Sequence, residues 1–325
     1  MTKRLTVFFE YALFILLLAF SMLLAFGKNY NSAVTDGLKL WVACVIPSLF
    51  PYFFITAILS SLSVTKNLSN KLTPLTRNLF NTSGATGYAF FMSIISGYPV
   101  GAKTVSDLKK SNLISNAEAV RASAFCSTSS PMFLISSVGG FMFENKSFGF
   151  VLFLVHLLSA ILTGVIFSFY KRKEKFNPPT TFNKNTAENL LYESVYSAVI
   201  SVLIVGGLIT VFYLLTEVLF SLKILTPIIN LFNTLFNDQN ISKGIVFGLF
   251  ECTKGLKELS LSGINFYTLP ICALLSGFGG LSVIMQSLAY LKSAKIKTAP
   301  FILAKLTMAV IGFILGLILS FIFGI

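Results

Sequence analysis

Long apolar runs alternate with short polar segments along the chain, and many of the runs are long enough to cross a lipid bilayer. A transmembrane α-helix needs about 20 consecutive apolar residues. The runs of this length are predicted membrane spans, and they cover residues 5–26, 38–62, 117–143, 148–170, 190–222, 266–290 and 300–323. The pattern therefore predicts an all-α polytopic membrane protein.

Shorter segments between the spans predict two other kinds of element. Residues 66–80 and 224–236 are amphipathic and each contains a proline, which indicates helices at the membrane surface. Residues 88–110 and 244–261 are apolar over only part of a membrane width and are interrupted near their middle. This pattern predicts two re-entrant helical hairpins.

Several spans contain residues that interrupt helices. Pro47 and Pro51 are expected to break the span at 38–62. Residues 126–131 interrupt the span at 117–143, where serine and threonine favour N-cap positions and Pro131 suits the first helical position. The glycine-rich segment 276–280 interrupts the span at 266–290. Kinks that only allow tight helix packing remain an alternative for these sites.

The order of elements occurs twice, which predicts an inverted repeat with two re-entrant hairpins and two broken helices. Span, surface helix, hairpin, broken span and span follow one another in residues 38–170 and again in 190–325. Residues 1–37 precede the repeats as a helix and loop, and 171–189 form a basic cytoplasmic linker. With the N-terminus inside, the two hairpins enter from opposite sides, as in secondary transporters built from inverted repeats.

Composition agrees with this class of protein. Of the 325 residues, 55% are hydrophobic and 11% are charged, and the mean hydropathy is +0.81. A soluble domain carries about 25% charged residues. Disorder, a secreted disulfide scaffold and an ordinary cytosolic enzyme are therefore excluded.

The net charge of +13 has a topological explanation. Most of the 25 Lys and Arg residues fall in segments that the topology places on the cytoplasmic side, as the positive-inside rule requires. The lipid bilayer is the expected partner, and nucleic acid is not.

Cofactor and metal chemistry is not indicated. The chain has four cysteines without a CxxC pair, one histidine and no HExxH motif. No haem, flavin or nucleotide-cofactor motif occurs, so no cofactor and no enzymatic activity are predicted.

The interruptions hold the candidate substrate site. Half-helices that end inside the membrane expose backbone N–H groups that attract anionic or polar ligands. The predicted substrate-binding residues are those at the hairpin tips and helix breaks, namely Ser96, Gly97, Tyr98, Pro99, Lys103, Ser127, Thr128, Ser129, Ser130, Glu251, Thr253, Lys254, Gly277, Gly279, Gly280, Ser282 and Gln286.

Charged residues near the hairpin tips are candidates for coupling transport to an ion. Lys103 and Lys254 each have an acidic residue four positions later, Asp107 and Glu258, as a candidate partner. Glu251 or Glu217 could carry a proton, and coupling to H⁺ or to Na⁺ is left open. His156 lies in an apolar span, where a packed side chain is favoured over a proton relay.

Residues 96–103, 125–131 and 276–283 resemble motifs of the nucleoside-recognition (Gate) domain family, and within it the YlbJ-like sporulation integral membrane proteins. The resemblance covers most of residues 38–320. It implies a fold similar to concentrative nucleoside transporters and a transport role linked to sporulation, in the bacterial cytoplasmic (inner) or forespore membrane. A dipicolinate-like aromatic acid or a nucleoside-like solute is the implied cargo. A non-transporting scaffold for envelope or spore assembly is the alternative, and homo-oligomerisation is left open.

Overall fold

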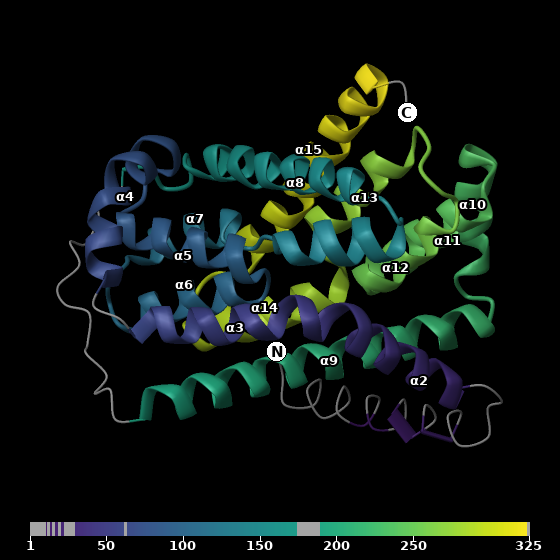
Figure 1. Cartoon of the computed structure of the whole chain (residues 1–325), viewed down its shortest axis with the longest axis horizontal. Helices are drawn as coiled ribbons and strands as arrows, with labels where there is room; N and C mark the ends of the chain where they lie inside the picture. Colours follow the sequence, from purple (N-terminus) through teal and green to yellow (C-terminus); the bar gives the residue numbers. More distant parts are fainter. Residues whose placement is uncertain are drawn as a thin grey trace.

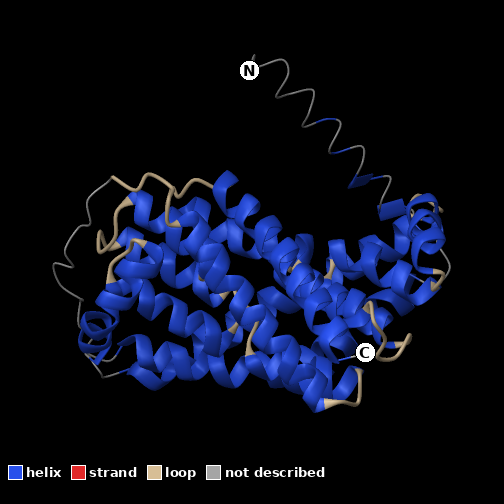
Figure 2. Cartoon of the chain, turned by 90° about the horizontal axis from the view of Figure 1, so that it is seen from above, coloured by secondary structure: helices blue, strands red, loops and turns tan. Residues whose placement is uncertain are grey.

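The computed structural model describes residues 30–61, 64–173 and 189–323, together with a few positions between 11 and 22. Within these ranges the chain is helical and contains no strand (Figure 2). Most of the predicted span at 5–26 and most of the linker at 171–189 lie outside the described residues. The all-α prediction is confirmed for the part that the structure describes.

Five described helices are long and apolar enough to cross a membrane. They are Tyr30–Leu59, Lys146–Phe167, Leu190–Ser221, Thr268–Ser293 and Ala299–Ile322. The predicted span at 117–143 is not among them, because it is divided into α7 (Asn116–Phe125) and the π-helix η2 (Met132–Met142). The chain is an integral membrane protein.

The first described span differs from its prediction. Helix α2 (Tyr30–Leu40) continues through the π-helix η1 (Trp41–Val45) into α3 (Ile46–Ser61), so Pro47 and Pro51 do not break it. The N–H of Ile46 bonds to the carbonyl of Trp41, one residue further back than in an α-helix. A π-turn of this kind takes up the distortion that a nearby proline introduces. The described helix reaches back to Tyr30, and its α2 part packs against α9 (Leu190–Ser221).

Two short helices lie at opposite ends of the molecule. In Figure 1, α4 (Val64–Phe80) lies at one end of the long axis and α10 (Thr226–Phe236) at the other, while α8 (Lys146–Phe167) and α9 run along it. Helix α4 packs on α5 (Gly84–Ser96), and α10 packs on α11 (Gln239–Phe250).

Each end helix leads into a helical hairpin. After α4, α5 turns back through α6 (Val100–Lys110), and after α10, α11 turns back through α12 (Cys252–Ser260). A divided helix follows each hairpin, α7–η2 in the first half and α13 (Thr268–Phe278) with α14 (Gly280–Ser293) in the second. A continuous helix closes each half, α8 and then α15 (Ala299–Phe323). The hairpins are thus held at their bases by end helices and reach toward the middle of the molecule.

Candidate functional site

The tip of the first hairpin is a tight turn against the first helix break. Gly97 has φ +79°, a conformation that a side chain strains. A Cβ atom at Gly97 would also lie 2.9 Å from the backbone nitrogen of Ser130. Ser96, the residue before Gly97, connects the tip to α3, because its Oγ donates to Oγ1 of Thr56 at 3.2 Å. A glycine is therefore required where hairpin and break meet.

The first break is the polar segment between α7 and η2, and two of its residues, Thr128 and Ser130, are fixed by side-chain hydrogen bonds. Ser130 Oγ accepts the N–H of Phe133 at 3.2 Å, which is the N-cap that the sequence predicts. The N–H of Thr128 donates to Ser93 Oγ on α5 at 3.1 Å. Thr128 thus ties the break to the first hairpin.

Two ionisable residues from distant helices complete the break. The N–H of Ser129 donates to Nε2 of His156 on α8 at 2.7 Å. The ammonium of Lys305 on α15 donates to the carbonyl oxygen of Ser127 at 3.1 Å. Both side chains are buried. Sequence reasoning did not assign Lys305 to the site, although an ionisable residue within a membrane span is by itself a sign of function.

The second hairpin and second break repeat this relationship with different residues. Between α11 and α12, Glu251 caps the following helix, because its Oε2 accepts the N–H of Lys254 at 2.6 Å. Gly279 and Gly280 divide α13 from α14 with φ values of +83° and +74°. A Cβ atom at Gly280 would lie 3.0 Å from the backbone nitrogen of Cys252. The break again rests directly on a hairpin tip.

Both tips, the first break and helix α14, which follows the second break, border one small cavity of about 30 Å³. The predicted site residues that line it are Gly97, Tyr98, Ser129, Ser130, Glu251, Thr253 and Gln286. Its remaining walls are Val45, Leu49, Phe133, Val205, Ile209, Cys252 and Val283. A space of this size holds one or two water molecules. In this conformation the tips are closed on each other.

Other predicted site residues lie outside this cavity. Ser96, Pro99, Ser127, Thr128, Lys254, Gly277, Gly279, Gly280 and Ser282 do not line it, and Lys103 lines a second cavity. Gly277 packs on α15, where a Cβ atom would lie 3.0 Å from Met308 O. These residues shape the breaks and tips, and direct substrate contact by them remains a prediction.

Lys254 does not pair with Glu258, the acidic residue four positions later that the sequence suggests. Its ammonium makes an ion pair with Glu217 on α9 at 2.6 Å and lies 4.1 Å from the ring centroid of Tyr213. Glu258 is not its partner because α12 turns Lys254 into the protein, where its side chain is 4% exposed. The pair joins the second hairpin to α9.

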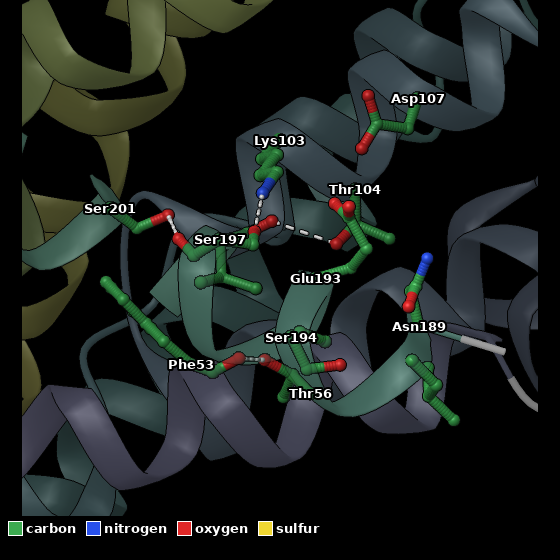
Figure 3. A pocket seen from close by; sticks show the side chains of 13 residues that line it. Phe53, Thr56, Lys103, Thr104, Asp107, Asn189, Glu193, Ser194, Ser197 and Ser201 are labelled. Carbon is green, nitrogen blue, oxygen red and sulfur yellow. Dashed lines mark hydrogen bonds between the residues drawn. The ribbon is translucent and has the colours of Figure 1, made fainter. Parts of the chain in front are cut away.

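A larger cavity of about 470 Å³ lies between α3, α6 and the start of α9 (Figure 3). Lys103 projects into it and donates to Ser197 Oγ at 2.9 Å, while Asp107, Glu193 and Asn189 line other parts of the wall. Its volume is typical of small-molecule sites. Val100, the first residue after the tip of the first hairpin, also lines it.

Several buried polar atoms near the breaks have no hydrogen-bond partner among the described residues. They are Oε1 of Gln286, Oγ of Ser127 and Nδ1 of His156. Buried polar atoms are almost always satisfied, so an unsatisfied one points to a water or a ligand. Of these three residues, only Gln286 borders the small cavity between the tips.

Comparison with known proteins agrees with the resemblance predicted from the sequence. Residues 42–144 match the model of the Gate family, described as nucleoside recognition. The chain is 29% identical over 304 residues to the sporulation integral membrane protein YlbJ of Bacillus subtilis (strain 168). That alignment covers 86% of this chain and 74% of the relative. No solved structure matches the chain.

Proposed function

We propose that the protein is a secondary transporter that moves a small polar or anionic solute across the membrane. The observation that carries the proposal is the shared cavity, which Tyr98, Ser130, Glu251 and Gln286 border from two hairpin tips and two broken helices. Interrupted helices are tolerated in a membrane only against protein or a water-filled cavity. In many secondary transporters, discontinuous helices of this kind form the substrate site near the bilayer midplane.

The two halves are proposed to be an inverted repeat. Support comes from the order of helices, which is the same in α4–α8 and α10–α15, and from α4 and α10 lying at opposite ends of the molecule (Figure 1). In an inverted repeat, the two hairpins enter the membrane from opposite sides. Rocking of one half against the other would then expose the same cavity to each side in turn.

The proposed substrate is an aromatic acid of the dipicolinate type or a nucleoside-like solute. Helix η2 begins beside the cavity, near Ser130, and helix N-termini favour negatively charged or polar groups. The rings of Tyr98 and Phe133 supply aromatic surface in the same wall. The sporulation relative favours the first substrate, and the Gate match favours the second.

The small cavity of about 30 Å³ cannot hold either solute, so transport requires the tips to separate. The larger cavity beside α6 is the proposed access path, because Val100 lies in its wall directly after the first tip. The wall of this path carries Lys103 together with the carboxylates of Asp107 and Glu193, so it offers polar groups of both signs to a solute.

The end that carries α4 is proposed to face the cytoplasm. Asn81, just after α4, donates to the carbonyl of Arg172 after α8, so these segments share one end. Basic residues lie close together at that end, because Lys292, Lys295 and Lys297 line the same surface hollows as Tyr170 and Lys171. Positive charge of this kind marks the cytoplasmic side. The cytoplasmic or forespore membrane is the proposed location, and a homo-oligomer is compatible with this arrangement.

Flux into proteoliposomes tests the proposal. Vesicles with the purified protein should take up labelled dipicolinate or a labelled nucleoside faster than empty vesicles do. Val283→Trp, which fills the cavity, should abolish uptake, whereas Leu281→Trp on the same helix should preserve it, because Leu281 is 40% exposed. Equal uptake with and without protein, across a panel of anions and nucleosides, would favour a non-transporting scaffold.

A further inference from the structure

Lys305 is a cation buried within the membrane-spanning part of the protein. Its side chain is fully buried in α15, and no ion pair involving it occurs within the described ranges. A charge inside a membrane protein is costly unless partner groups replace its hydration. Lys305 therefore needs a specific set of partners.

The partners of Lys305 come from the first break and the first hairpin tip. The ammonium donates to Ser127 O at 3.1 Å and lies 5.4 Å from the ring centroid of Tyr98. Ser127 follows the last turn of α7, which ends at Phe125. The carbonyl end of a half-helix carries a partial negative charge, and an aromatic face also attracts a cation. The structure thus provides a cation site at this break.

In transporters with discontinuous helices, unwound carbonyls and half-helix C-terminal ends coordinate the coupling Na⁺. In this protein the carbonyl of Ser127, which follows α7, is such a position, and the ammonium of Lys305 binds to it. Lys305 lies on α15, 178 residues later in the sequence. The ammonium is covalently attached and cannot leave during a transport cycle.

We propose that Lys305 is the built-in cation of the first helix break and that the protein consequently binds no Na⁺ there. The consequence for transport, namely Na⁺-independent flux, rests on the function proposed above. The statement about binding does not, because occupancy of the site can be measured without any solute.

The test is the thermal unfolding of the purified full-length protein in detergent at constant ionic strength. For the wild type, replacing NaCl by choline chloride should leave the Tm unchanged. Lys305→Ala should lower the Tm and open a site that small cations can fill. Na⁺ or methylammonium should then raise the Tm of this variant in a saturable way, because a ligand that binds only the folded state stabilises it.

Lys305→Met is the matched control, because it removes the charge but keeps most of the volume. Its Tm should not respond to Na⁺ or methylammonium, and choline should be ineffective in both variants because it is too large. Saturable stabilisation of the wild type by Na⁺ would overturn the proposal, as would a Lys305→Ala variant that is indifferent to both cations. If Lys305→Ala does not fold, the wild-type titration decides.

The outcome separates this inference from the transport proposal. Na⁺-driven flux through the wild type would support transport and contradict the built-in cation. Absence of flux for every solute tested would contradict transport and leave the thermal result valid.

Discussion

The backbone N–H of Ser129 donates to Nε2 of His156 across 2.7 Å, so the histidine of α8 accepts one of the N–H groups that the first helix break leaves free. An accepting Nε2 carries no proton, which makes His156 a neutral imidazole in this arrangement. The side chain is 1% exposed. Its role in this contact is to satisfy the backbone of the break.

Removing this acceptor should destabilise the protein. His156→Ala leaves the Ser129 N–H buried without a partner and should cost about 1–3 kcal/mol of unfolding free energy. His156→Gln, whose amide oxygen can accept, should recover part of that loss. Thermal unfolding in detergent measures both, and Leu158→Ala on the exposed face of α8 is the control. Equal stability of His156→Ala and wild type would contradict this role.

The glycines at the junctions of tip and break should not tolerate a side chain. Gly97→Ala and Gly280→Ala combine a positive φ with contacts of 2.9 Å and 3.0 Å, so each should lower stability by more than about 1 kcal/mol. Gly263→Ala isolates the conformational strain, because Gly263 has φ +67° and open space around it.

A second control measures the effect of replacing a glycine by alanine inside a helix where no contact or strain opposes it. Gly207→Ala in α9 meets no atom within 4 Å and should be neutral or stabilising, since alanine favours a helix. If Gly97→Ala and Gly280→Ala lose no more stability than Gly263→Ala, the tips do not pack on the breaks as described.

The ion pair between Lys254 and Glu217 should stabilise the attachment of the second hairpin to α9. Glu217→Gln leaves a 4% exposed ammonium without its carboxylate and should cost about 1–3 kcal/mol, less than a fully buried pair because Glu217 is 34% exposed. A double-mutant cycle with Lys254→Met measures the coupling, using thermal unfolding. Additive effects of the two substitutions would show that the pair contributes nothing.

Gln286 should be needed for solute flux but not for stability. Its Oε1 has no partner within the described part of the chain, whereas its Nε2 donates to Ser282 Oγ at 3.3 Å. Gln286→Leu removes one unsatisfied buried atom and one long hydrogen bond, and should therefore change the Tm little. Uptake by proteoliposomes should fall at least tenfold if the amide contacts the solute. A loss of stability together with retained uptake would assign Gln286 a packing role instead.

The helix breaks could be predicted from the sequence because their causes are local. Serine and proline at 127–131 and glycine at 279–280 have intrinsic preferences for caps and for positive φ, and the structure has its interruptions at these residues. Local reasoning was wrong at Pro47 and Pro51. A π-helical turn and packing on α9 keep that helix continuous.

The partners of the breaks could not be predicted, because they depend on long-range packing. Ser129 and His156 are 27 residues apart, and Ser127 and Lys305 are 178 apart. Lys254 illustrates the same limit. The spacing of four residues favours Glu258, but the carboxylate that pairs with Lys254 lies 37 residues earlier on another helix.

The most direct test of the central claim, that the cavity between the tips opens to bind solute, is the alkylation of Cys252. This thiol lines the cavity and is 1% exposed, so it can react only when the tips separate. Cys44, Cys126 and Cys272 would first be replaced by alanine. We expect N-ethylmaleimide to label Cys252 in proteoliposomes, and a transported solute to slow the labelling in proportion to its occupancy. Absence of labelling in the folded protein, or labelling that no solute from the panel slows, would contradict the account.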